Sequence, residues 1–242
     1  MPAPRTERVT VARGNGRTMH HMNVLILGAS RGIGLEFVRQ YQADGHRVTG
    51  TARDDDGLQR LRDLGATALR LDVADVAGAS ALAWPLDGEA FDLVVFNAGV
   101  YGPRTSGLQT PTQAEFDAVM HVNVLGAMRV LPQIEAALAP GAVLAVISSR
   151  MGSMGLRTNA SGWLYRASKA ALNSLLKDAS LALGGRATCV ALHPGWVRTD
   201  MGGEGADLDV AHSVAAMRRT LAAVTPAQSG EFLDHDGTPL AW

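Results

Sequence analysis

Cysteine and lysine are both scarce in this sequence, and each scarcity restricts what the protein can be. The 242 residues include one cysteine, Cys189, which has no second cysteine for an internal disulfide. We therefore predict a reducing compartment, the cytoplasm. The only two lysines are Lys169 and Lys177, so arginine supplies nearly all of the positive charge.

Long apolar runs and an excess of charge of either sign are also missing. No apolar run approaches the ~18 residues of a membrane-spanning helix, so we expect no membrane partner. A formal net charge of −1 argues against a surface for nucleic acid. No cluster of histidine and cysteine has metal-ligand spacing, and we predict no metal site. With 47% hydrophobic and 19% charged residues, the composition is that of a folded globular protein.

Residues 1–21 differ from the rest of the sequence. They read MPAPRTERVTVARGNGRTMHH and contain arginines but no apolar core, which excludes a secretory signal. An arginine-rich targeting arm is an alternative, and we favour a disordered extension. The remaining residues, 22–242, contain no linker, repeat or low-complexity stretch, so we predict that they form a single domain.

From residue 23 onward, apolar runs typical of buried strands alternate with segments of helical periodicity. We predict strands at 23–28, 47–52, 66–72, 91–97, 142–148, 188–193 and 231–234. We predict helices at 32–45, 56–64, 75–84, 163–183 and 112–139, the last with a bend at Pro132. This alternation is typical of an α/β fold, in which a mostly parallel, seven-stranded sheet lies between two layers of helices. Ligands bind at the carboxyl ends of the strands in such sheets, so the residues after each strand are the candidate site.

A glycine-rich turn, Gly28-Ala29-Ser30-Arg31-Gly32-Ile33-Gly34, follows the first predicted strand. Glycines allow a tight turn and a close approach to a pyrophosphate, and the next helix offers that anion free N–H groups and its positive dipole end. The spacing differs from the G-x-G-x-x-G dinucleotide fingerprint, so the turn alone is a moderate signal. Its place after the first buried strand favours a dinucleotide site over tight packing.

Tyr165 and Lys169 are four residues apart in a predicted helix and therefore lie on the same helix face. An unperturbed tyrosine, with a pKa of ~10, is a poor acid–base catalyst at neutral pH, and a neighbouring ammonium lowers that pKa. Lys169, one of the only two lysines, is thus placed where its ammonium can lower the pKa of Tyr165. The alternative is a half-buried core tyrosine beside a lysine that extends to solvent.

The glycine turn and the motifs that follow it in order resemble those of the short-chain dehydrogenase/reductase family. These motifs are Asp72-Val73, Phe96-Asn97-Ala98-Gly99, His121-Val122-Asn123-Val124, Tyr165-Arg166-Ala167-Ser168-Lys169 and His193-Pro194-Gly195-Trp196-Val197-Arg198-Thr199. Segments 148–156, 165–173, 193–203 and 232–242 resemble the C-factor and Sniffer type of carbonyl reductase within that family. The resemblance covers essentially all of 23–242 and implies a Rossmann-like fold.

The resemblance also implies roles for particular residues. Tyr165 would donate a proton to a substrate carbonyl, and Lys169 would lower its pKa. Ser149 would polarise the carbonyl, and Asn123 would hold a water that completes a proton relay. The residues implied in binding a nicotinamide dinucleotide are Gly28, Ser30, Arg31, Gly32, Ile33, Gly34, Arg53, Asp72, Val73, Asn97, Ala98, Gly99, Tyr165, Lys169, Pro194, Gly195, Val197 and Thr199.

Some assignments have alternatives or depart from the family pattern. Ser148 and Ser153 compete with Ser149, and Asn123 could instead bond a nearby backbone carbonyl. Leu27 and Phe96 replace residues common in the family, and we expect both to be structural variants. Four large side chains near the cleft either line an apolar substrate pocket or simply pack: Met151, Trp163, Trp196 and Met201.

We predict NADP(H) as the preferred cofactor, with NAD(H) as the alternative. The second strand is predicted to end at Ala52, where an NAD enzyme usually places a carboxylate for the ribose hydroxyls. Arg53 and Arg31 would instead converge on the 2′-phosphate of NADP(H). The opposing feature is Asp54, which would reach the ribose if the strand ran longer.

These features predict an enzyme that transfers a hydride between a nicotinamide and a small carbonyl or alcohol, most simply an NADPH-dependent carbonyl reductase. One alternative is a dinucleotide-binding regulatory protein with little turnover, which would not need Tyr165 and Lys169. A methyltransferase with a similar sheet is a second alternative. The resemblance also implies a homo-oligomer, a dimer or a tetramer, paired through the helices at 112–139 and 163–183.

Overall fold

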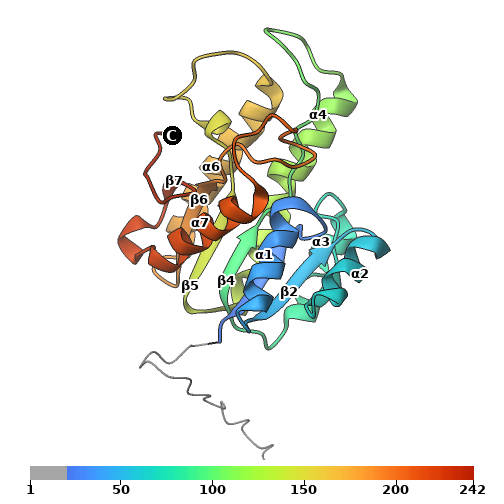
Figure 1. Cartoon of the computed structure of the whole chain (residues 1–242), viewed down its shortest axis with the longest axis vertical. Coiled ribbons are helices and arrows are strands. Elements are labelled where there is room, and N and C mark those ends of the chain that lie inside the picture. Colours follow the sequence, from blue (N-terminus) through green and yellow to red (C-terminus); the bar gives the residue numbers. More distant parts are fainter. Residues whose placement is uncertain (1–20) are drawn as a thin grey trace, which may run out of the picture.

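Seven parallel strands form a twisted sheet between two layers of helices in a computed structural model, which describes residues 21–242 (Figure 1). The strands are β1 Asn23–Leu27, β2 Arg47–Ala52, β3 Thr67–Arg70, β4 Phe91–Phe96, β5 Leu138–Ile147, β6 Ala187–His193 and β7 Glu231–Asp234. They lie in the order β3-β2-β1-β4-β5-β6-β7, and every neighbouring pair is parallel. The predicted seven-stranded α/β fold is confirmed, and the sheet is parallel throughout. The predicted extension lies outside the described residues except for His21, which contacts the carbonyl of Gly45.

The helices cover both faces of the sheet. They are α1 Gly32–Ala43, α2 Asp55–Asp63, α3 Val76–Ser80, α4 Gln113–Met120, α5 Gly126–Ile134, α6 Trp163–Ala182 and α7 Val210–Ala223. Helices α1 and α7 lie side by side over one face (Figure 1). Among the described residues, no helix has the length and hydropathy to cross a membrane.

Side chains of most strands alternate between two hydrophobic cores, one on each face of the sheet. In β1, Val24 and Ile26 pack in the core beneath α1, α2 and α7, whereas Leu25 and Leu27 pack in the core beneath α5 and α6. A strand that is buried on both faces needs an uninterrupted apolar run, which is why β1 is readily predicted. The unusual residues Leu27 and Phe96 are both fully buried in the second core, as expected of structural variants.

The prediction of one continuous helix over 112–139 is wrong. Helix α4 ends at Met120, a π-helical segment spans His121–Leu125, and α5 continues to Ile134. Pro132 lies inside α5, and the irregular segment lies upstream of it, around the buried Asn123. A π-helical turn adds a residue per turn, and such turns are frequent at functional sites.

Other boundaries also differ from the predictions. Strand β3 is shorter than 66–72, and the predicted helix at 75–84 is the short α3 followed by a 3₁₀ turn at Trp84–Leu86. Strand β5 begins earlier than predicted, and helix α7 was not predicted at all. The signal for α7 was present, because Asp209 caps its first turn and its buried residues recur at helical spacing.

Candidate active site

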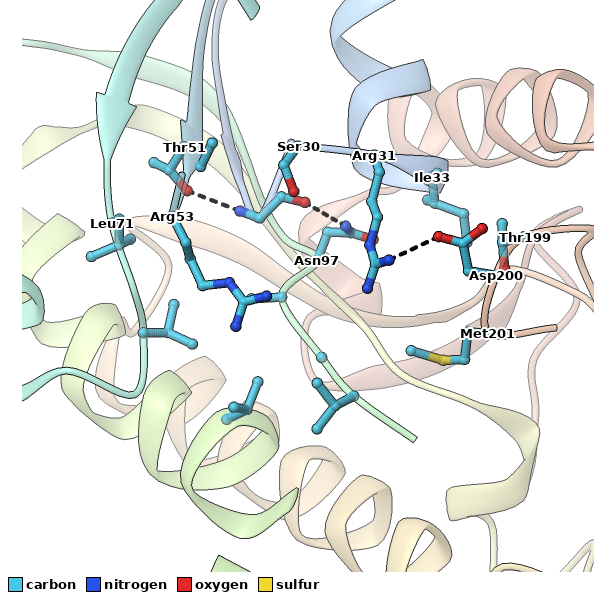
Figure 2. Close-up of a pocket in the computed structure, with 18 of the residues that line it drawn as sticks. Ser30, Arg31, Ile33, Thr51, Arg53, Leu71, Asn97, Thr199, Asp200 and Met201 are labelled. Atoms are coloured by element: carbon cyan, nitrogen blue, oxygen red, sulfur yellow. Dashed lines mark hydrogen bonds and ion pairs between the residues drawn. The ribbon is translucent and has the colours of Figure 1, made fainter. Parts of the chain in front are cut away.

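The glycine turn after β1 is held by residues from two neighbouring strands. The Gly28 amide donates to Thr51 Oγ1 (2.9 Å), and the Gly28 carbonyl accepts from Asn97 Nδ2 (2.7 Å) (Figure 2). Gly28 has a φ of +84°, and a Cβ there would lie 2.8 Å from the backbone of Ala98. A Cβ at Gly34 would lie 2.2 Å from the carbonyl oxygen of Gly28. These two positions therefore require glycine for close packing.

The N-terminus of α1 is the part of this turn that suits an anion. Arg31 occupies the N-cap position of α1 and makes no side-chain capping bond. Side chains cap the first turns of α2, α3, α4 and α7. The leading N–H groups of α1, together with its dipole, therefore remain available for a phosphate.

A cavity of about 310 Å³ extends from this helix N-terminus along the carboxyl ends of the strands (Figure 2). Its lining includes most of the residues predicted to bind the dinucleotide, namely Gly28, Ser30, Arg31, Gly32, Ile33, Arg53, Asp72, Val73, Asn97, Ala98, Gly99 and Thr199. Gly34 lies behind the turn, and Pro194, Gly195 and Val197 line a second cavity. The sequence analysis missed several lining residues, among them Leu71, Val122, Arg198 and Asp200.

The sequence left open whether Arg53 or Asp54 would face the ribose of the dinucleotide, and the two side chains lie differently in the structure. Arg53 lines the cavity, and its side chain extends into it from the end of β2 (Figure 2). Asp54 is the N-cap residue of α2 and accepts a hydrogen bond from the Gly57 amide (2.7 Å). The Asp54 carboxylate is thus engaged in the helix cap, and it does not line the cavity.

Arg31 and Arg53 line the same cavity, but among the described residues Arg31 forms an ion pair and Arg53 does not. The Arg31 guanidinium forms an ion pair with Asp200, in the loop after β6, at 2.8 Å (Figure 2). Both side chains are largely exposed. The predicted approach of Arg31 to a 2′-phosphate would require this ion pair to open.

The second cavity, of about 550 Å³, adjoins the first and contains the predicted catalytic tyrosine. Ile33, Thr199 and Met201 line both cavities, so the two are continuous. Of the large side chains that the sequence left unassigned, Met151, Trp196 and Met201 line the second cavity, and Trp163 does not.

The contacts of the three candidate serines differ. Ser153 is fully buried and donates to the backbone carbonyl of Ala241 (2.6 Å), away from the cavity. Ser148 lines the cavity, but its hydroxyl donates to Asn173 Oδ1 (2.5 Å). Ser149 lines the cavity, its Oγ accepts from the Met151 amide (3.1 Å), and its hydroxyl acts on Tyr165 so as to lower the pKa of the phenol. Its position therefore fits the predicted role best.

Glycines position the serine turn against α6. Gly152 packs so closely on α6 that a Cβ would lie 2.8 Å from the backbone of Lys169. Gly162 is the N-cap residue of α6 and has a φ of +62°, and a Cβ there would lie 2.5 Å from the Tyr101 hydroxyl. The residues between Ser149 and Tyr165 thus loop out between two positions that require glycine.

Burial dominates the electrostatics of Tyr165 and Lys169. It raises the pKa of Tyr165 above its usual range and lowers the pKa of Lys169 to about 8. The Lys169 ammonium donates to the backbone carbonyl of Ile147 (2.8 Å) and lies 5.7 Å from the centre of the Tyr165 ring. The two groups predicted from their spacing therefore share one buried location, with the tyrosine as a neutral phenol.

Asn123 is fully buried, and its hydrogen bonds join the π-helical segment to the loop after β4 and to helix α6. Its Oδ1 accepts from the Val100 amide (2.8 Å), and its Nδ2 donates to the Val100 carbonyl (2.8 Å) and to Ser168 Oγ (2.9 Å). A Cβ at Gly99 would lie 3.3 Å from Lys169 Nζ and 3.4 Å from Asn123 Oδ1. The alternative of a bond to a backbone carbonyl is therefore realised, and the contacts give the side chain a positioning role. The water relay stays a prediction.

Two residues of the loop after β4 belong to this site and were missed by the sequence analysis. The Tyr101 ring stacks on the Tyr165 ring, with centroids 4.6 Å apart. The Arg104 guanidinium lies 5.0 Å from the Tyr101 ring centroid and donates to the Met201 carbonyl (2.8 Å). No local sequence pattern indicates the contacts of Tyr101 with Tyr165 and of Arg104 with Met201, because they join segments far apart in the chain. The described residues contain no cluster of three or more potential metal ligands.

Comparison with known proteins gives a consistent result. Residues 22–207 match the family described as short chain dehydrogenase. The C-signal protein of Myxococcus xanthus is 38% identical over 154 residues, which are 62% of this chain and 92% of that protein. A structure of a short-chain dehydrogenase/reductase from Burkholderia multivorans with bound NADP is 30% identical, with a TM-score of 0.84 over 92% of this chain and 100% of that one. The carbonyl reductase Sniffer of D. melanogaster is 29% identical, with a TM-score of 0.81 over the same shares.

Proposed function

The chain belongs to the short-chain dehydrogenase family and is an oxidoreductase, and we propose that it reduces carbonyl compounds with NADPH. The observation that carries this proposal is the position of Tyr165. Its phenol lines the larger cavity beside Ser149, this cavity adjoins the groove that suits a dinucleotide, and Lys169 is buried next to Tyr165. A binding protein without turnover has no need of this arrangement.

The side chains present fit the steps of a carbonyl reduction. NADPH, when bound, supplies the hydride. The Ser149 hydroxyl donates a hydrogen bond to the carbonyl oxygen, where negative charge develops. Tyr165 then donates its proton to that oxygen, a role for which its neutral phenol is ready. The Lys169 ammonium stabilises the phenolate that remains. Asn123 holds the loop after β4 against α6, so that Gly99 and Lys169 keep their places.

The preference for NADPH over NADH is part of this proposal. It is supported by Arg53 in the cavity wall at the end of β2, and by the engagement of Asp54 in the cap of α2. The similar structure from Burkholderia multivorans contains NADP. A guanidinium can bind a phosphate through paired, charge-assisted hydrogen bonds.

The test is a panel of aldehydes and ketones with NADPH, followed by the loss of NADPH absorbance. Tyr165→Phe is the matched variant, because it removes only the hydroxyl and leaves the ring to stack on Tyr101. We expect turnover by the wild type, near-complete loss in Tyr165→Phe, and similar NADPH affinity for both. Turnover by Tyr165→Phe at the wild-type rate would contradict the assigned proton donor. NADPH binding without any turnover would favour the regulatory alternative.

We also propose that the chain forms a homo-oligomer through α4, α5 and α6. The support is that large apolar side chains are exposed on each of them: Phe116 on α4, Met128 on α5 and Leu181 on α6. Light scattering coupled to gel filtration measures the mass directly. A monomer at micromolar concentration would contradict this part of the proposal.

A further inference from the structure

The larger cavity carries positive charge without a matching carboxylate. Arg104, Arg150 and Arg166 line it, and the described residues of its wall include no aspartate or glutamate. None of the three arginines forms an ion pair with a carboxylate in the described part of the chain. We infer that the carbonyl substrate bears a carboxylate or a phosphate group. This inference rests on the proposed function and names the class of substrate.

Arg150 is the arginine best placed to bind such a group. It directly follows Ser149, the residue proposed to hold the carbonyl oxygen, and it begins the 3₁₀ turn Arg150–Gly152. Arg150 is an exposed residue, and within residues 21–242 its side chain forms no hydrogen bond. Its charge nevertheless reaches the cavity: burial lowers the pKa of His193 on the same wall, and the Arg150 cation contributes to that lowering. A structural role for Arg150 would require contacts that it does not make.

Arg166 contributes a buried positive charge next to Tyr165. Its side chain is bound only to neutral acceptors, the Ser161 carbonyl through Nε (2.7 Å) and Asn159 Oδ1 through Nη2 (2.7 Å). Neutral partners satisfy the hydrogen bonds of a guanidinium without cancelling its charge, and an unneutralised buried charge is unfavourable. An anionic ligand in the cavity would relieve that unfavourable energy.

Arg104 is the third arginine of the cavity wall. Its guanidinium lies 5.0 Å from the centroid of the Tyr101 ring, which stacks on Tyr165. The wall also includes large apolar side chains, among them Met151, Leu156 and Trp196. The cavity therefore fits a substrate with an apolar body, a carbonyl near Tyr165 and an anionic group near Arg150.

The test compares two aldehydes that differ in charge but little in shape, 4-formylbenzoate and its neutral amide, 4-formylbenzamide. We expect kcat/KM to be at least about tenfold higher for the anion, mainly through a lower KM. The ratio should fall as salt is added, because ions screen the attraction. 4-Formylphenyl phosphate, run alongside, shows whether carboxylate or phosphate is preferred.

Arg150→Gln should bring the ratio of the two kcat/KM values close to one. Arg166→Gln should lower the ratio as well, although this variant also loosens the loop at 159–161. Arg62→Gln is the matched control, an exposed arginine on α2 that lines neither cavity and should leave the ratio unchanged. A ratio that survives in Arg150→Gln would overturn the inference.

Failure of the inference can be told apart from failure of the proposed function. Equal reduction of both aldehydes by the wild type would overturn the inference and leave carbonyl reduction standing. If neither aldehyde is reduced, the same charge preference is measured by calorimetry with two unreactive ligands, terephthalate and terephthalamide. Tighter binding of terephthalate, lost in Arg150→Gln, would support the anion site. Equal affinities, or no binding, would overturn it.

Discussion

The Arg31 guanidinium and the Asp200 carboxylate join the glycine turn to the loop after β6 through an ion pair of 2.8 Å (Figure 2). Both residues line the groove proposed for the dinucleotide. Asp200 therefore competes with a cofactor phosphate for the same guanidinium. An exposed pair of this kind contributes about 0–1 kcal/mol, so a phosphate can displace it.

Asp200→Asn is expected to tighten the binding of NADPH by up to about fivefold, because Arg31 is then free to bind phosphate. Titration of the NADPH fluorescence measures the dissociation constant. Asp178→Asn, an exposed aspartate of α6 without an ion pair in the described structure, serves as the control. Weaker binding by Asp200→Asn would show that the ion pair instead holds the loop in its binding shape.

Two of the serines near the end of β5, Ser149 and Ser153, should differ in a kinetic and thermal comparison. Ser149→Ala is expected to lower kcat about 10²–10³-fold, the usual effect of removing a hydrogen bond to a developing oxyanion. Ser153→Ala removes a buried hydroxyl that bonds Ala241 and accepts from Leu156. It should lower the melting temperature and leave kcat close to the wild-type value. If Ser153→Ala loses more turnover than Ser149→Ala, the assignment of the serine is wrong.

The cofactor preference should follow the residues at the end of β2. We expect the wild type to show a kcat/KM at least about tenfold higher with NADPH than with NADH. The double variant Ala52→Asp with Arg53→Ala should move this ratio toward NADH, because it replaces a phosphate-binding cation with a ribose-binding carboxylate. Asp54→Asn is the control, since Asn also caps helices and Asp54 lies outside the groove wall. An unchanged ratio in the double variant would contradict the role of Arg53.

Lys169 should reduce stability at neutral pH. Burial lowers the pKa of Lys169 from 10.5 to about 8, whereas the unfolded chain keeps the ordinary value. Between these two pH values the unfolded state binds more protons, so the stability of the folded protein rises with pH across this range. Below pH 8 the folded protein carries the full unfavourable energy of a buried ammonium.

Lys169→Met should therefore abolish turnover and raise the free energy of unfolding at pH 7, by on the order of 3 kcal/mol less the lost hydrogen bond to Ile147. The gain should shrink toward pH 10. Urea denaturation at both pH values, without cofactor, measures it. Lys177→Met, the only other lysine and an exposed one, should change stability little at either pH. A variant that is equally destabilised at both pH values would contradict this account.

The sequence was sufficient for the features that depend on local patterns. Apolar runs that are buried on both faces indicated the strands, and the four-residue spacing of Tyr165 and Lys169 placed them on one helix face. The sequence was insufficient around Asn123, where a π-helical segment interrupts the expected helix. The periodicity there is close to that of an α-helix, and the interruption is fixed by bonds from Asn123 to Val100 and Ser168.

The sequence by itself thus determined the seven strands, the glycine turn and the residues that follow each strand, because these depend on neighbours within a few positions. Only the tertiary structure decided which serine faces Tyr165, that Asp54 caps a helix, that Arg31 pairs with Asp200, and that Tyr101 stacks on Tyr165. Most of these contacts join residues far apart in the chain, where the partner is selected by packing and geometry. The cap at Asp54 is local, but the carboxylate could have served either the helix or a ribose, and the end of β2 at Ala52 settled which.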